Sequence, residues 1–270
     1  MNKIYFHADD YGRSKQISNN IINCIKKGNI NSVSVMVSYL PYIYHKKLKN
    51  LKNVNIKLHL NLTELPRKNL KKINDLSFLK LVFLKSKNKK IIYNEIENQI
   101  KRYKKLYKLK SIQIDGHEHV QMIPWIFNFI KKLKKKYNIT EVRITNEKLL
   151  FPRIYDLFSL SYFRNLLACI LLKFFNYFLD VSEISTKIFI GIVYTGQQTE
   201  DTIHKTISPY KKLENRSIEL LVHPGFTNKK EIKLFKSKFY KFYSHYNRKR
   251  EYKLCFSDNI KNIIKKFNDK

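Results

Sequence analysis

The chain has 270 residues, with 54 Lys and Arg against 21 Asp and Glu, so its formal net charge is +33. This length suits one α/β domain with a large core, and we predict a single domain over residues 1–270. The three cysteines are far apart and form no CxxC pair, which excludes a disulfide-stapled scaffold and fits a reducing compartment.

The positive charge would ordinarily indicate nucleic acid or an anionic membrane as a partner. The lysines, however, are spread along the whole chain beside abundant Asn and Ile, as expected from coding bias toward A and T. A dedicated nucleic-acid surface would concentrate its charge in a patch or stripe. We therefore do not expect nucleic acid as a partner.

The first residues, MNKIYFHADD, do not resemble a secretory signal peptide. They contain one Lys and no apolar segment ending in small residues. A cytoplasmic protein is expected.

Strand-like and helix-like segments alternate along the chain. Apolar, β-rich runs predict strands at 3–8, 31–38, 55–62, 111–116, 141–146, 187–192 and 217–223. Helical spacing predicts a first helix that ends at Gly28 and further helices over 91–107 and 124–137, and basic helical stretches close the chain. Such alternation is typical of parallel strands joined by crossover helices.

Polar residues stand at or near the carboxyl ends of several predicted strands, where β/α barrels carry their active sites. They are Asp9, Asp10, His59, Asn61, Asp115, His117, His119 and His223. Neither GxGxxG nor GxxxxGK[ST] occurs, so a dinucleotide-binding sheet and a phosphate loop have no support. The pattern favours a TIM-barrel-like α/β fold with about seven parallel strands.

The adjacent carboxylates of Asp9 and Asp10 repel each other, and their burial costs free energy unless a cation compensates. Taken alone, such a pair is often a turn or a helix cap, and a lone His in an apolar strand is often a hydrogen-bonded core residue. The run DGHEH is more specific, because Asp115 is near enough to orient an imidazole. Carboxylates and imidazoles without thiolate suit Zn, Mn, Fe or Mg.

These motifs carry a resemblance. HADDYG, LHLNLTE, DGHEHVQMIP, VRITNE and IELLVHPG are similar, in kind and order, to the carbohydrate deacetylases of the YdjC family, which includes chitooligosaccharide deacetylase. The match runs from the start to about residue 225. Three positions depart from the family pattern: His7 replaces an Asn, Leu65 a Gly, and Gln121 the last His of HxHxH. The last two bear on substrate specificity.

The resemblance implies a distorted β/α barrel and metal-dependent removal of an N-acetyl group from an amino sugar or oligosaccharide, with release of acetate. By this resemblance Asp10, His59 and His117 hold one divalent ion, Mg²⁺ or Zn²⁺. Asp9 looks like the general base and His223 like the general acid or an oxyanion-side group. Residues expected to bind substrate or support the ligands are Asp115, His119, Arg143 and Asn61. Within the pairs Asp9/Asp10 and His117/His119 the roles remain interchangeable at this point.

Two other functions share these residues. One is a metal-dependent hydrolase that cuts an ester or phosphoester on the same scaffold, since a barrel does not dictate its substrate. The other is a non-catalytic carbohydrate-binding relative, which would be expected to have lost a ligand or the base. This chain keeps both.

Residues 151–180 contain the most apolar stretch, LLACILLKFFNYFL over 166–179. It is shorter than the ~20 residues that span a bilayer, and Lys173 interrupts it. One interpretation is a helix that covers the barrel or forms a homodimer surface. The other is an interfacial or lid element through which the protein approaches a lipid-linked, anionic amino sugar at the inner face of a membrane.

Overall fold

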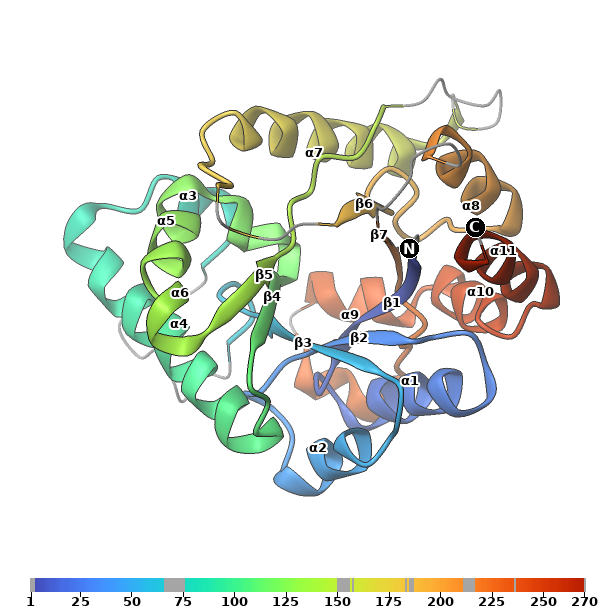
Figure 1. The fold of residues 1–270 in the computed structure, drawn as a ribbon, viewed down its shortest axis with the longest axis horizontal. Coiled ribbons are helices and arrows are strands. Elements are labelled where there is room, and N and C mark those ends of the chain that lie inside the picture. Colours follow the sequence, from blue (N-terminus) through green and yellow to red (C-terminus); the bar gives the residue numbers. More distant parts are fainter. Residues whose placement is uncertain are drawn as a thin grey trace.

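The computed structural model describes residues 3–65, 76–149, 156, 158–182, 184, 187–210, 217–235 and 237–269. Seven parallel strands form one curled sheet in the order β5-β4-β3-β2-β1-β7-β6 (Figure 1). Their bounds are β1 Lys3–Tyr11, β2 Ser32–Val35, β3 Asn55–Leu60, β4 Ile112–Gly116, β5 Ile139–Val142, β6 Ile188–Ile190 and β7 Ser217–Val222. Strand neighbours follow the chain order, and within the described ranges no ladder joins β5 to β6. The fold is thus a distorted β/α barrel opened between these two strands, which confirms the predicted fold class.

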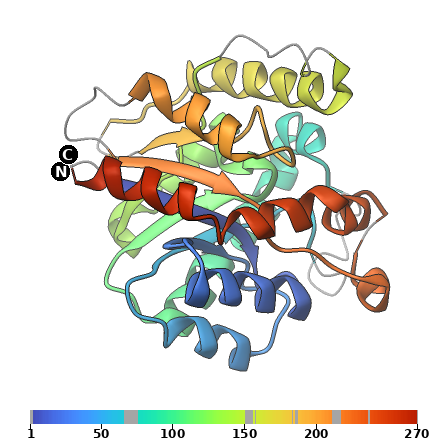
Figure 2. The same cartoon turned by 90° about the vertical axis from the view of Figure 1, so that its right-hand side faces the viewer.

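Helices cover the outside of the sheet (Figures 1 and 2). The α-helices are α1 Lys15–Lys27, α2 Tyr42–Lys49, α3 Phe78–Val82, α4 Ser86–Tyr107, α5 Pro124–Lys132, α6 Lys134–Tyr137, α7 Leu160–Asn176, α8 Glu200–Ile207, α9 Ser237–Ser244, α10 Tyr246–Leu254 and α11 Asp258–Asn268. The 3₁₀ turns are η1 His117–Met122, η3 Ser208–Tyr210 and η4 Lys229–Leu234. Among the described residues, no helix has both the length and the apolar character needed to cross a membrane.

Local sequence signals explain where several helices begin and end. The Ser14 hydroxyl accepts the Ile17 N–H at the start of α1, and Gly28 follows its last turn. Pro124 opens α5 at the position where its missing N–H costs nothing. The helix predicted over 124–137 is divided at Leu133 into α5 and α6. The two chain ends meet, because Ile4 N donates to Asn268 Oδ1 at 2.9 Å.

The two faces of the sheet have opposite character. Ile4, Phe6 and Ala8 of β1 lie in the hydrophobic layer under the helices. The inner face is polar: the Lys57 ammonium of β3 contacts carboxylates of both β5 and β7, which only a side chain inside the curl can do. Most β/α barrels fill this space with branched apolar residues, so the interior here needs charge pairing to be stable.

Several predicted strands differ from the structure in their bounds. Those predicted at 31–38, 55–62 and 187–192 are shorter, at Ser32–Val35, Asn55–Leu60 and Ile188–Ile190. The strand predicted at 141–146 is observed at Ile139–Val142, whose last residue pairs with Ile114 of β4, and the Arg143 N–H still donates to the Ile114 carbonyl at 2.9 Å. Arg143 thus follows the last residue of β5 directly. The strand predicted at 3–8 continues to Tyr11, so Asp9 and Asp10 lie within it.

Candidate active site

A bulge at the end of β1 brings both adjacent carboxylates to the same end of the barrel. The register with β2 shifts between Ala8 and Tyr11, and Asp10 adopts a left-handed φ of 72°. A non-glycine residue with positive φ carries backbone strain, which is typical of functional sites. Without this irregularity, neighbouring strand residues would point to opposite faces.

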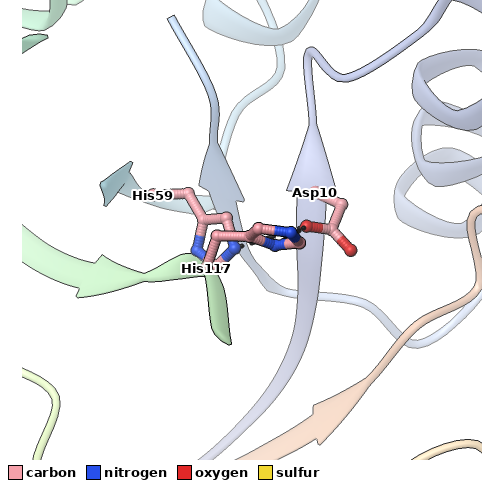
Figure 3. A group of neighbouring side chains, drawn as sticks. All are labelled: Asp10, His59 and His117. Carbon is pink, nitrogen blue, oxygen red and sulfur yellow. Dashed lines mark ion pairs between the residues drawn. The ribbon is translucent and has the colours of Figure 1, made fainter. Parts of the chain in front are cut away.

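Asp10, His59 and His117 converge at this end of the barrel (Figure 3). Asp10 Oδ1 lies 3.3 Å from His59 Nε2 and 3.2 Å from His117 Nδ1. One ligand atom from each residue lies within 4.8 Å of the others. The residues come from the ends of β1 and β3 and from the start of η1, so three separate parts of the chain build the cluster.

The unsatisfied atoms of this cluster fit a metal ion. Asp10 Oδ1 and His59 Nε2 are buried and hydrogen-bond to none of the described residues, a costly condition that a cation would relieve. Two imidazoles and one carboxylate are a common donor set for Zn²⁺ and related ions. Two further groupings, His7/Asp115/Glu219 and Asp9/His59/Asp115, are also close enough to hold an ion, but Arg143 already binds their carboxylates.

Each histidine of the cluster has a carboxylate behind it. His59 Nδ1 lies 2.7 Å from Asp115 Oδ1, which fixes the tautomer whose Nε2 is free to bind a cation. His117 Nε2 lies 3.8 Å from Glu64 Oε2, and Glu64 is itself paired with Arg13. His59 is therefore oriented by a hydrogen bond, whereas Glu64 faces His117 only as a nearby charge, at a distance too long for a hydrogen bond.

The charges around the cluster set its protonation. Burial alone would raise the pKa of Asp10, but the imidazoles of His117 and His59 lower it far below its usual value. Burial would lower the pKa of His59, yet Asp9, Asp10 and Asp115 raise it to about 10. The surrounding carboxylates thus favour a positive charge at this point, and a proton on His59 supplies it when no metal is bound.

Asp9 has a different environment from Asp10. Its two oxygens bind Arg143 Nη1 and Nη2, each at 2.8 Å, and Oδ1 also lies 2.9 Å from His7 Nε2. Burial acts to raise the pKa of Asp9, but Arg143, His59 and His7 hold it well below the usual range. Asp9 therefore remains ionised, and its Oδ2 accepts a hydrogen bond from Arg143 Nη1.

His223 follows β7 and faces the same cavity. Its backbone N–H donates to Glu251 Oε2 at 2.7 Å, and its ring packs edge-on against Phe242. Burial and the nearby Arg248 charge lower its pKa to about 4. The ring is therefore neutral near pH 7 in the unliganded site, with one N–H to donate.

These groups line one cavity of about 520 Å³. Asp9, Asp10, His59, His117, His119 and His223 all face it. The rest of the lining is mainly apolar and comes from α3, α7 and α9, with Phe78, Leu171, Leu172, Phe239 and Phe242. The site thus combines a few polar groups with apolar walls, as small-molecule sites usually do.

The remaining predicted site residues occupy supporting positions. The His119 ring packs edge-on against Phe189 and burial lowers its pKa to about 4, while its neighbour His117 faces Asp10. Asn61 does not line the cavity; its side chain donates to the Tyr39 hydroxyl and to the Glu64 carbonyl. Asn61 therefore shapes the loop that carries Glu64.

Sequence reasoning missed three residues of the site. Glu64 belongs to the quoted LTE motif, and its place after the third strand was a usable signal. Arg13, three residues after Asp10, binds that glutamate. Glu251 lies on α10, and nothing in the sequence pattern connects it with His223.

Known proteins resemble this chain over different extents. Two curated relatives are named carbohydrate deacetylase: one from Danio rerio, 27% identical over 157 residues (54% of this chain, 50% of the relative), and one from Vibrio campbellii, 25% identical over 144 residues (51% of this chain, 57% of the relative). The chain thus matches about half the length of each.

A solved structure from Enterococcus faecalis V583, whose name describes cellobiose-phosphate cleavage, covers 99% of this chain and 95% of its own. Its TM-score of 0.68 at 18% identity shows a shared fold. The family model described as YdjC-like protein matches residues 3–266. The resemblance seen in the motifs is thereby confirmed, and the chain belongs to the YdjC family.

Proposed function

We propose that this protein is a metal-dependent hydrolase that removes the N-acetyl group from an amino sugar or oligosaccharide and releases acetate. The observation that carries the proposal is the convergence of Asp10, His59 and His117, with unsatisfied buried atoms, beside Asp9 and His223 in one cavity. The names of the two curated relatives give the chemical class.

The proposed ligands of one divalent ion, Zn²⁺ or Mg²⁺, are Asp10, His59 and His117. When bound, the ion would supply the Lewis acidity that an unactivated amide requires. The imidazoles favour Zn²⁺ over Mg²⁺, which prefers oxygen ligands. Asp115 holds the His59 ring by a hydrogen bond of 2.7 Å, and the Glu64 carboxylate lies 3.8 Å from His117 Nε2.

Asp9 is the proposed proton acceptor for the attacking water. It is ionised, it faces the cavity, and Arg143 holds its carboxylate in a fixed orientation. Because its pKa is low, Asp9 is a weak base, so its contribution depends on position more than on proton affinity. The two hydrogen bonds from the Arg143 guanidinium lower the pKa of Asp9 and also fix the position of its carboxylate.

His223 is the proposed donor on the opposite side of the reacting carbonyl. As a neutral ring it can donate one hydrogen bond to the oxygen that gains negative charge. That charge would raise the affinity of the ring for a second proton, and the proton that Asp9 takes from the attacking water is the one that would pass, through the ring, to the leaving amine. The apolar walls from α7 and α9 exclude water and suit the acetyl methyl group and the nonpolar faces of a sugar.

Acetate release tests the proposal directly. The purified protein, loaded with Zn²⁺ or Mg²⁺ or treated with a chelator, is incubated with N-acetylglucosamine, its short β-linked oligomers and their phosphorylated forms. We expect acetate only with metal. Aryl acetate and aryl phosphate esters serve as controls for the two alternative hydrolase reactions, and faster cleavage of either ester than of every N-acetyl sugar would contradict the proposal.

A further inference from the structure

Helix α7 carries an uninterrupted apolar stripe on its outer side. The stripe residues recur at alternating spacings of three and four: Leu160, Phe163, Leu167, Ile170 and Phe174 within the helix, and Tyr177 directly after its last residue. All are exposed, with Leu160 at 88%, Leu167 at 68% and Phe174 at 59%. Large apolar side chains are normally scattered singly on a protein surface, so a row of this length indicates a contact surface.

The stripe lies opposite the packed side of the helix. Tyr162, Asn165, Cys169 and Leu172 are buried against the protein, about half a helical turn away. Arg164 and Leu171 lie between the two sides and line the active-site cavity. One helix thus forms a wall of the cavity with one face and an exposed apolar row with the adjacent face. Figure 2 shows α7 along one edge of the molecule.

The charge of the protein favours an anionic lipid surface over a second copy of the chain as the partner of this stripe. Residues 157–179 contain no acidic residue, and the charged side chains within α7 are Arg164 and Lys173. A second copy would bring another chain of net charge +33 against the first and would offer no carboxylate from its own α7 to pair with them. An anionic lipid surface would attract the same charge while burying the row.

We infer that the α7 stripe is a docking surface for an anionic membrane, on which it lies parallel to the bilayer plane and presents the cavity to lipid headgroups. The apolar side chains enter the boundary between headgroups and acyl chains, and Arg164 and Lys173 meet the anionic headgroups. The inference is independent of the proposed reaction, because docking is measured without substrate.

Cosedimentation with vesicles tests this docking. The full chain is mixed with phosphatidylcholine vesicles with and without phosphatidylglycerol, at low and at high salt. We expect binding to the anionic vesicles that weakens with salt. Leu167→Ser combined with Phe174→Ser should lower the partition coefficient by about tenfold or more. Neither residue lines the cavity, and both are exposed, so the fold should be retained.

A matched control changes Tyr42 and Ile43 to Ser, since these residues of α2 are exposed to 57% and 54%. This control should bind vesicles like the wild type. A single Leu167→Glu change should also reduce binding, because it adds negative charge to the surface with minimal repacking. The inference is wrong if the wild type stays in solution with every vesicle, if the control loses as much binding as the stripe variant, or if the stripe variant instead dissociates a wild-type dimer that ignores vesicles.

Discussion

Two buried polar clusters lie inside the same barrel, one deep in its interior and one at its mouth, and they differ in how their charges are satisfied. In the interior cluster Lys57 contacts Glu141 and Glu219, while Arg143 binds Glu219, Asp9 and Asp115. In the mouth cluster, formed by Asp10, His59 and His117, Asp10 Oδ1 and His59 Nε2 are buried and make no hydrogen bond to a described residue; they contact each other only as an ion pair at 3.3 Å.

This difference distinguishes a cluster that stabilises the fold from a cluster that is a candidate binding site. A buried ion pair in which every charge has a partner is costly to break, but its atoms have no remaining capacity to bind a ligand. A buried polar atom without a partner is costly while it stays empty, so it persists where a ligand completes it. Arg143 joins the two clusters, because the cation that neutralises the interior also fixes Asp9 at the mouth.

The largest predicted effect is the loss of metal and turnover when a residue of the mouth cluster is replaced. His59→Ala should remove bound metal and reduce turnover by at least about a thousandfold, because the ion loses one of its nitrogen ligands. The protein should remain folded, since Asp115 keeps its bonds to Arg143 and Ser34. Metal content by elemental analysis and acetate release give the two readouts.

His45 provides the matched control: it is a buried histidine outside the mouth cluster, with its Nδ1 2.9 Å from the Tyr107 hydroxyl and its ring edge-on against Tyr11. His45→Ala should lower the free energy of unfolding by about 1 to 3 kcal/mol and leave metal content unchanged. Full metal content in His59→Ala would show that the ligands are misassigned.

Substitutions in the interior cluster should lower the stability of the fold, in contrast to the loss of metal and turnover expected at the mouth. Lys57→Met keeps the apolar stem but leaves Glu141 and Glu219 without their shared ammonium, so the free energy of unfolding should fall by about 3 to 5 kcal/mol. Lys101→Met removes an exposed partner of Glu97 at 3.5 Å and should cost about 0 to 1 kcal/mol. Urea unfolding of both variants measures the contrast, and equal losses would mean that the interior pairs contribute no more than surface pairs.

The sequence predicted the mouth better than the interior for a physical reason. Asp10, His59 and His117 lie at strand ends within motifs, and strand ends of a parallel barrel meet at one face, so local pattern and topology suffice to place them. The partners of Lys57 come from β5 and β7, far along the chain, and depend on the register and curl of the sheet. No local pattern carries that information.

The bulge in β1 was equally hidden. A regular strand would have pointed Asp9 and Asp10 to opposite faces, and no local pattern indicates that φ of Asp10 is positive. The motif resemblance located the residues, while the irregular backbone that brings both to the site could only be seen in the structure.

Asp9 lies between the two clusters. Its substitution should reduce turnover less than the substitution of His59 does. Asp9→Asn keeps the shape and one acceptor oxygen for Arg143, so metal content should be unchanged. Turnover should fall by about a hundredfold with KM unchanged, the scale of a lost general base. Loss of metal in place of turnover would exchange the roles of Asp9 and Asp10, and unchanged turnover would make Asp9 only a partner of Arg143.

The smallest effect should come from Glu147, a buried carboxylate outside both clusters. Its Oε2 accepts the backbone N–H groups of Ile192, at 2.7 Å, and Val193, and so bridges the opening between β5 and β6. Burial outweighs these hydrogen bonds and raises its pKa to about 7 from an ordinary value near 4.5. Because the folded state binds the proton more tightly, the contribution of Glu147 to stability is fully present below about pH 4.5 and is lost as pH rises through 7.

Glu147→Gln keeps an acceptor oxygen and cannot ionise. The free energy of unfolding of this variant should therefore exceed that of the wild type by about 1 to 3 kcal/mol between pH 5 and pH 8. Urea unfolding of both proteins across this range measures the gain, and a difference independent of pH would mean that Glu147 ionises as freely in the folded protein as in the unfolded chain.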